Sequence, residues 1–171
     1  MKDVQAVPTM TFADAAEDHL EDVLAYLVYL TRDPVLAEDL TADTFERALR
    51  LWSRYDARKG SARTWLCQVA RTTALDHFRA AERRRRREAT YAREELRRSE
   101  GPLVEGLSPE LEDALRGLTA AEREVIALRV VLELDGPAAA RVLGISPSAC
   151  STRLSRALQR LEERMRDAVA A

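Results

Sequence analysis

"GPAAARVLGISPSACSTRLSRALQRL", residues 136–161, predicts two helices that meet at a tight turn. Gly144 can adopt the left-handed conformation that ends a helix, and Ser146 followed by Pro147 is a pair that starts one. The small side chain of Ala140 lets the two helices approach closely. The segment therefore predicts a helix-turn-helix, and the alternative is a plain helical hairpin with a solvated face.

The second helix of this pair has an apolar and a polar face. We expect the apolar side chains to face the bundle: Ile145, Cys150, Leu154, Leu158 and Leu161. Short hydroxyl side chains near a helix N-terminus, followed by arginine, suit contacts with phosphates and base edges in a major groove. The candidate DNA contacts are Ser148, Ser151, Thr152, Arg153, Ser155 and Arg156.

Apolar residues also recur at helical spacing over residues 20–30, 36–52 and 65–78. Several residues are typical helix starts: Asp33 before Pro34, Ser61, Ser108 before Pro109, and the capping box from Thr119 to Glu122. No run of alternating β-branched residues predicts a strand. We therefore expect an all-α fold of two small helical bundles, residues 15–93 and 110–168, joined by a flexible linker over residues 94–109.

Charge alternates along the chain although its net charge is only −2. Residues 1–50 have a net charge of −7, residues 51–93 of +8, residues 94–135 of −6 and residues 136–171 of +3. The first basic segment includes five consecutive arginines, Arg83 to Arg87. A nucleic acid would meet two positive zones, and a protein partner could bind the acidic ones.

Several functional classes find no support in the sequence. There is no long apolar run and no secretory signal, so we expect a cytoplasmic protein with no membrane contact. Cys67 and Cys150 lie far from each other and from both histidines, which argues against a metal site or a disulfide. His77 and Asp76 have no neighbouring nucleophile. We expect no enzyme activity and no cofactor.

Three further segments carry a family resemblance. The stretch AEDLTADTFERALR, residues 37–50, and the stretch SARTWLCQVARTTALDHFR, residues 61–79, resemble region 2 of bacterial sigma-70 factors. The stretch LTAAEREVIALRV, residues 118–130, together with the helix-turn-helix resembles region 4. With little between the two regions, the chain is similar to the extracytoplasmic-function (ECF) group. The resemblance implies a promoter-specificity subunit that binds core RNA polymerase and promoter DNA and has no catalysis of its own.

The resemblance also implies roles for individual residues. It assigns a core-polymerase contact to the acidic residues Glu38, Asp39, Asp43 and Glu46. It assigns the melted −10 element to Tyr55, Arg58, Lys59, Arg63, Thr72, Asp76, Arg79, Arg83 and Arg84. The arginines of residues 83–87 would neutralise backbone phosphates, and the helix-turn-helix residues named above would read the −35 element. We expect Trp52 and Trp65 to be core anchors and Tyr55 to be the stacking residue.

Three positions depart from the pattern of the family, which usually has Gln at Ala42, Asn at Thr72 and a basic residue at Ser151. The departures concern one polymerase contact, one base-pocket hydrogen bond and the charge of the −35 reading helix. They leave promoter preference open.

Two other functions compete with this interpretation. One is an autonomous helix-turn-helix DNA-binding transcription regulator, and the other is an adaptor whose basic helix meets an acidic partner. An anti-sigma factor is a further candidate partner. So is an AAA+ unfoldase-protease, because Ala170 and Ala171 form a small apolar end that resembles a degradation signal, the alternative being an ordinary frayed helix end.

Overall fold

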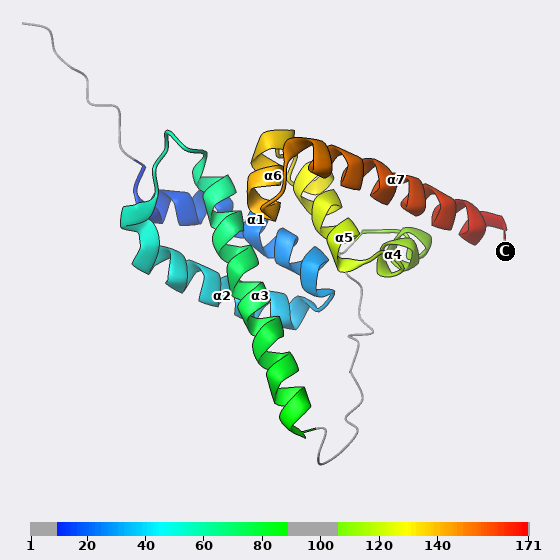
Figure 1. The fold of residues 1–171 in the computed structure, drawn as a ribbon, viewed down its shortest axis with the longest axis horizontal. Helices are drawn as coiled ribbons and strands as arrows, with labels where there is room; N and C mark the ends of the chain where they lie inside the picture. Colours follow the sequence, from blue (N-terminus) through cyan, green and yellow to red (C-terminus); the bar gives the residue numbers. More distant parts are fainter. Residues whose placement is uncertain (1–9, 89–105, 171) are drawn as a thin grey trace, which may run out of the picture.

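The computed structural model describes residues 10–88 and 106–170, and these ranges contain α-helices and no strand (Figure 1). The first bundle comprises α1 (Phe12–Thr31), α2 (Pro34–Leu51) and α3 (Ala62–Glu88). The second bundle comprises α4 (Pro109–Arg116), α5 (Ala120–Ile126), α6 (Gly136–Leu143) and α7 (Pro147–Ala170). The predicted all-α fold of two small bundles is confirmed.

The helix starts that the sequence predicted are capped by side chains. Asp33 accepts hydrogen bonds of 3.1 Å from the backbone amides of both Val35 and Leu36. The Ser61 hydroxyl accepts from the amide of Thr64 at 3.2 Å, and Thr119 and Glu122 form the predicted capping box. These caps satisfy amide groups that have no partner within the helix.

Helix α1 begins at Phe12, two turns before the apolar pattern that starts at Leu20. Thr11 and Asp14 form a capping box there: the Thr11 amide donates to Asp14 Oδ2 at 2.8 Å, and the Asp14 amide donates to the Thr11 hydroxyl at 3.2 Å. The first turns bury the small side chain of Ala15, which adds little to an apolar pattern. The helix therefore begins before the apolar pattern of residues 20–30, because its first residue is set by the cap.

An aromatic cluster fixes the connection between α2 and α3. A 3₁₀ turn (Trp52–Arg54) follows α2, and the Trp52 ring stacks on Tyr55 with centroids 4.7 Å apart. Trp65, on α3, contacts the same two rings, with centroids 5.7 Å from each. Trp52 and Trp65 thus pack against the core as expected, and they hold residues 55–61 against the start of α3.

The second bundle has two features that the sequence did not predict. A π-helical turn (Ala127–Val131) follows α5 and leaves Val130 and Val131 exposed, and Glu133 then adopts a left-handed φ of 52°. On α7 the buried stripe runs through Cys150, Leu154, Ala157 and Leu161, so Leu158 is 42% exposed. The prediction that Leu158 faces the bundle is wrong. The four buried residues are separated by four, three and four positions, which keeps them on one face of the helix. Ala157 takes the place on that face that was predicted for Leu158, and Leu158 lies beside it.

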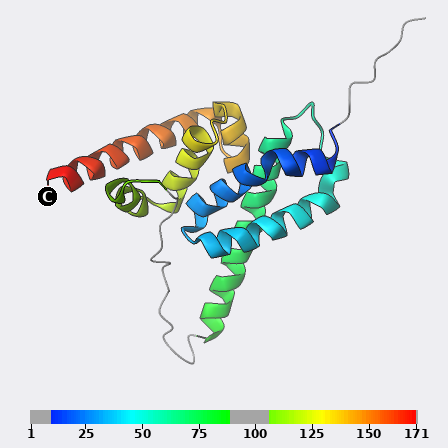
Figure 2. The same cartoon turned by 180° about the vertical axis from the view of Figure 1, so that it is seen from behind.

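The bundles lie side by side, with α6 against α3 and α5 against α1. The two opposite views agree that the C-terminal ends of α3 and α7 extend beyond the rest of the body in different directions (Figure 1, Figure 2). The extended end of α3 carries the five arginines. None of the helices in the described ranges combines the length and apolar character needed to cross a membrane.

Candidate functional site

One exposed face of α2 is acidic. Glu38, Asp39, Asp43 and Glu46 all lie on it with Ala42 among them. The opposite face is buried, and its two hydroxyls are satisfied: Thr41 donates to the carbonyl of Ala37 at 2.7 Å, and Thr44 donates to that of Leu40 at 2.6 Å. Glu46 also forms an ion pair with Arg50 one turn later. The four predicted polymerase contacts therefore share one solvent-facing surface, which we call the acidic face.

An apolar groove that sequence reasoning missed borders the acidic face. It lies between α1 and α2, holds about 540 Å³, and is lined by Ala16, Glu17, Leu20, Leu24, Glu38, Thr41, Ala42 and Phe45. Leu20 is 49% exposed, although the periodic pattern placed it with the core residues. The sequence feature that could have indicated this groove is the spacing of Leu20 and Leu24 by one helical turn. We call this surface the α1–α2 groove.

The loop before α3 is held in shape by its own side chains. The carboxylate of Asp56 accepts from the backbone amide, Nε and Nη2 of Arg58, each at 3.0 Å. These bonds with Arg58 hold the pKa of Asp56 below its usual range. The Tyr55 hydroxyl donates to the Gly60 carbonyl at 3.3 Å, and Arg63 forms an ion pair of 3.6 Å with Asp22 on α1. In this arrangement the Tyr55 ring packs on Trp52, while Lys59 is exposed.

Four of the predicted −10 residues form a stripe along α3. Thr72, Asp76, Arg79 and Arg83 are exposed at spacings of four, three and four residues, which places them on one helix face. Arg47 on α2 donates to Asp76 at 2.9 Å, and Arg79 lies 3.5 Å from the same carboxylate. The hydrogen bond from Arg47, with the charges of Arg47, Arg79 and Arg83, holds the pKa of Asp76 below its usual range. The stripe is therefore cationic with its one acid already paired.

The arginines beyond the stripe are exposed too. Arg83 to Arg87 all face solvent around the last turns of α3. Among the described side chains, Arg86 pairs with Glu82 at 2.9 Å, and Arg87 donates to the Arg83 carbonyl at 3.3 Å. Because this segment projects from the body, a nucleic-acid backbone can reach it (Figure 1).

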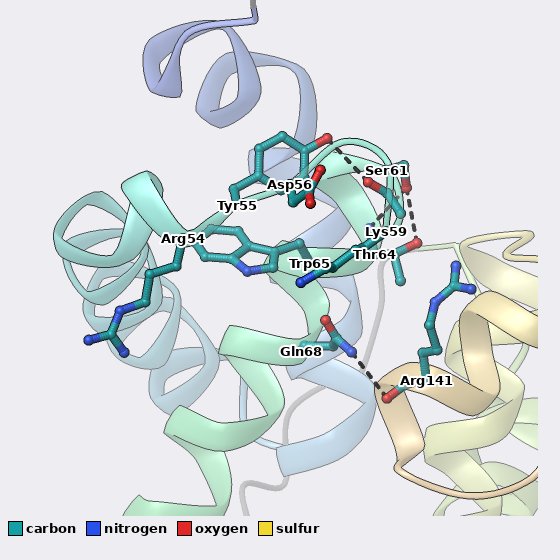
Figure 3. A pocket seen from close by; sticks show the side chains of 10 residues that line it. Arg54, Tyr55, Asp56, Lys59, Ser61, Thr64, Trp65, Gln68 and Arg141 are labelled. Atoms are coloured by element: carbon teal, nitrogen blue, oxygen red, sulfur yellow. Dashed lines mark hydrogen bonds between the residues drawn. The ribbon is translucent and has the colours of Figure 1, made fainter.

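A polar cleft of about 340 Å³ separates the loop before α3 from α6 (Figure 3). Its lining includes Lys59, Ser61, Thr64, Trp65 and Gln68 from the first bundle and Arg141 from the second. The Gln68 amide donates to the Arg141 carbonyl at 3.3 Å and closes one end. The loop that the resemblance assigns to the −10 element thus faces the first helix of the helix-turn-helix.

The helix-turn-helix has the predicted turn. Gly144 is left-handed, with φ of 67°, and the Ser146 hydroxyl accepts from the Ala149 amide at 3.2 Å to cap α7. Five of the six predicted contacts are exposed on α7: Ser148, Ser151, Thr152, Ser155 and Arg156. The sixth, Arg153, is half-buried and acts electrostatically on Cys150. The structure therefore separates Arg153 from the other five, which we call the hydroxyl face.

Neither cysteine is poised for thiol chemistry. Burial raises the pKa of the Cys67 thiol to about 12, and burial also raises the pKa of Cys150, partly offset by Arg129 and Arg153. Throughout residues 10–88 and 106–170, no three histidine, cysteine or carboxylate side chains gather as metal ligands would. Ala171 and the side chain of Ala170 lie outside the described residues, so the degradation signal stays a prediction.

Comparison with known proteins identifies two family models along the chain. Residues 15–84 match sigma-70 region 2, and residues 108–161 match sigma-70 region 4. The chain is 32% identical over 169 residues to the ECF RNA polymerase sigma factor BldN of Streptomyces coelicolor, covering 95% of this chain and 63% of BldN. It is 31% identical over 163 residues to the ECF sigma factor SigM of Bacillus subtilis, covering 90% of this chain and 94% of SigM.

The fold is also similar to a solved structure. The sigma factor RpoE of Bartonella quintana, crystallised with the anti-sigma factor NepR, superposes with a TM-score of 0.77 at 24% identity, covering 91% of this chain and 96% of that one. At this identity the likeness concerns the fold alone.

Proposed function

The chain belongs to the sigma-70 family of RNA polymerase sigma factors, and we propose that it acts as an ECF sigma factor that directs core polymerase to specific promoters. One observation carries the proposal: a region 2 match and a region 4 match follow each other in one chain, each with its own exposed polar surface. In this function the protein binds and positions, and the polymerase performs the chemistry. We assign it to the cytoplasm, where polymerase and promoter are.

We divide the chain by function into three parts. Residues 15–93 form the domain for core polymerase and the −10 element, residues 94–109 form the linker, and residues 110–168 form the domain for the −35 element. The start of α4 at Pro109, capped by Ser108, supports the second boundary.

The acidic face and the α1–α2 groove together form the proposed polymerase contact. The groove supplies apolar area through Leu20, Leu24 and Phe45, and Glu17 and Glu38 lie at its edge. A partner helix with an apolar stripe flanked by lysines or arginines would bury the groove and pair with the acidic face. The acidity has a second consequence, because this surface repels DNA and stays available to the polymerase.

The stripe on α3 and the loop before it form the proposed −10 contact. A cationic groove holds the backbone of a single strand, and exposed polar groups such as Thr72 and Asp76 can bond unstacked bases. Arg83 to Arg87 would contact phosphates of the neighbouring duplex and add affinity without sequence preference. Thr72 donates its hydroxyl to the Gln68 carbonyl at 2.9 Å, so its oxygen is left to accept from a base.

The hydroxyl face of α7 is the proposed −35 reader. Ser148 lies in the first turn of a long helix, where free backbone amides favour phosphate, and Arg156 follows about two turns later on the same face. Arg156 has the reach and donors to bond a guanine in the major groove. Arg153, which is half-buried beside this face, is kept as a candidate contact with the −35 element.

Run-off transcription tests the proposal. Purified core polymerase is incubated with genomic promoter fragments, with and without this protein, and we expect discrete new transcripts only when it is present. Tight, sequence-specific binding to duplex DNA without polymerase, together with no new transcript, would instead support an autonomous regulator. An anti-sigma factor remains a candidate partner, and co-purification from cells tests it.

A further inference from the structure

The polar cleft between the loop before α3 and α6 has a positively charged lining. Lys59 comes from the loop and Arg141 from α6, and both side chains are exposed. Within residues 10–88 and 106–170, neither of them forms an ion pair with a carboxylate. Asp56, the acidic residue of the lining, instead accepts three bonds of 3.0 Å from Arg58. The cleft is therefore a cationic cavity whose acid is already paired.

The charged groups of Lys59 and Arg141 lie on either side of the same space. Figure 3 shows Arg141 extending from α6 toward the loop and Lys59 extending inward from the loop, whereas Arg54 points away from both. A β-carbon added at Gly60 would lie 3.5 Å from Nη2 of Arg141, so the guanidinium group reaches the loop. An anion in the cleft can therefore form a charge-assisted hydrogen bond with each of the two side chains.

The same lining supplies neutral hydrogen-bonding groups. Ser61 Oγ and Thr64 Oγ1 lie 3.0 Å apart, and the bond between them uses only one of their two O–H groups. The other O–H group is left to donate to a ligand. Gln68 uses its amide nitrogen for the 3.3 Å bond to the Arg141 carbonyl, which leaves its side-chain oxygen as an acceptor.

Part of the lining is aromatic. Tyr55 and Trp65 both line the cleft, with their ring centroids 5.7 Å apart, and both are half-buried. Each ring also contacts Trp52, which fixes its position. A planar heterocycle can pack on such rings, as nucleic-acid bases do on aromatic side chains.

We propose that this cleft binds a free phosphorylated nucleotide, with its phosphates between Lys59 and Arg141 and its base on Trp65. The cavity of about 340 Å³ lies at the lower end of the range of about 300–1,000 Å³ for small-molecule sites. The bond from Gln68 to the Arg141 carbonyl closes one end of the cleft, which suits a ligand with an end of its own rather than a continuous strand. The inference goes beyond the proposed function, because promoter recognition does not call for a free nucleotide.

A diphosphate fits the two cations better than a single phosphate does. Lys59 and Arg141 extend from opposite walls, so each can bond a different phosphate group. Arginine can hold phosphate oxygens with two parallel bonds, and lysine acts as a compact point charge. Nucleoside diphosphates are therefore the probes of choice.

The test measures the binding of ADP and of GDP to the full chain by isothermal titration calorimetry. Inorganic pyrophosphate serves as the same phosphate group without a base. The chain has two tryptophans, Trp52 and Trp65, and both belong to the aromatic cluster beside the cleft. Tryptophan fluorescence therefore reports whether a base packs there.

Three variants change the cleft in two different ways. Arg141→Gln and Lys59→Gln each remove one charge, and the Arg141 carbonyl that bonds Gln68 is retained. Gly60→Leu keeps both charges and places a side chain in the cleft, at a residue whose φ is not left-handed. Arg166→Gln is the matched control, since it makes the same change at an exposed arginine on α7. Circular dichroism checks that each variant is folded.

We expect both diphosphates to bind the wild type more tightly than pyrophosphate and to quench its tryptophan fluorescence. Arg141→Gln and Lys59→Gln should each weaken this binding about tenfold, Gly60→Leu should weaken it as well, and Arg166→Gln should leave it unchanged. A wild type that binds neither diphosphate would overturn the proposal, and so would equal losses in Arg141→Gln and Arg166→Gln. Pyrophosphate that binds as tightly as ADP would overturn the base contact.

A single-stranded DNA oligonucleotide separates a free nucleotide from a strand as the source of the phosphate. We expect Arg141→Gln to weaken ADP and GDP binding and to leave the affinity for the oligonucleotide unchanged. If the oligonucleotide lost affinity by the same factor, a strand would be the occupant of the cleft and the proposal would be wrong.

Discussion

Arg47 on α2 donates a 2.9 Å hydrogen bond from Nη1 to Oδ2 of Asp76 on α3. The bond joins the helix of the acidic face to the proposed −10 stripe. It also sets the ionisation of Asp76, whose carboxylate is otherwise exposed. Arg47 was not among the predicted contact residues, yet it positions Asp76, which was predicted to contact the −10 element.

The first prediction concerns the pKa of Asp76. Because Arg47 lowers this pKa in the folded chain, the pair stabilises the fold above the ordinary aspartate pKa, and this stabilisation is lost as pH falls through the folded pKa. Arg47→Ala should raise the pKa of Asp76 toward its ordinary value. Carboxyl-carbon NMR titration measures it. Arg50→Ala, which breaks the neighbouring exposed pair with Glu46, should leave it unchanged. Equal shifts in both variants would mean that Arg47 has no specific effect.

The second prediction concerns polymerase binding. Asp39→Lys together with Asp43→Lys should weaken co-purification with core polymerase, because the change reverses charge on the acidic face while both side chains remain exposed. Glu162→Lys with Glu163→Lys on α7 is the control for a change of the same total charge. A pull-down that is unchanged in the first double variant would remove the assignment of the acidic face.

The third prediction separates base reading from phosphate binding. Arg156→Ala should reduce transcription mainly from promoters with an intact −35 element, through the loss of about 1–3 kcal/mol of base contact. Replacing Arg83 to Arg87 by glutamine should weaken open complexes at all promoters alike and flatten their dependence on salt, since fewer counterions are released. If the variant with all five arginines replaced changed its promoter choice and kept the wild-type dependence of open complexes on salt, this separation of base reading from phosphate binding would be wrong.

The fourth prediction concerns the turn of the helix-turn-helix. Gly144→Ala should destabilise the second bundle by about 1 kcal/mol, because Gly144 has φ of 67°, where a β-carbon is strained. Gly136→Ala is the matched control, since a β-carbon there would meet nothing within 4 Å and φ is not left-handed. Urea unfolding followed by circular dichroism compares the two. Equal midpoints for both variants would show that the turn tolerates a side chain.

The fifth prediction concerns protein lifetime. If the C-terminal alanines are recognised by an unfoldase-protease, Ala170→Asp with Ala171→Asp should lengthen the half-life in cells and leave transcription in vitro unchanged. The half-life is measured after protein synthesis is blocked. Identical decay of the two forms would favour an ordinary frayed helix end.

The sequence by itself determined the local features of this protein. Asp33, Ser61 and Thr119 were predicted as caps, and Gly144 as a turn, because each acts on backbone groups within three residues of itself. The acidic residues of α2 were named through the family resemblance, which rests on a short continuous segment. The family motifs are also continuous segments, so region 2 and region 4 could be identified without a structure.

Tertiary structure decided everything that depends on which surfaces meet. Leu20 has the right spacing for a core residue, yet it is exposed, because periodicity shows that a face is apolar and not whether another helix covers it. The pairing of Tyr26 with Glu124 joins residues 98 positions apart, and no local pattern marks either as the partner of the other. Such contacts form only when the two bundles dock, and the free energy of docking comes from shape and burial over whole surfaces, which a one-dimensional pattern does not contain.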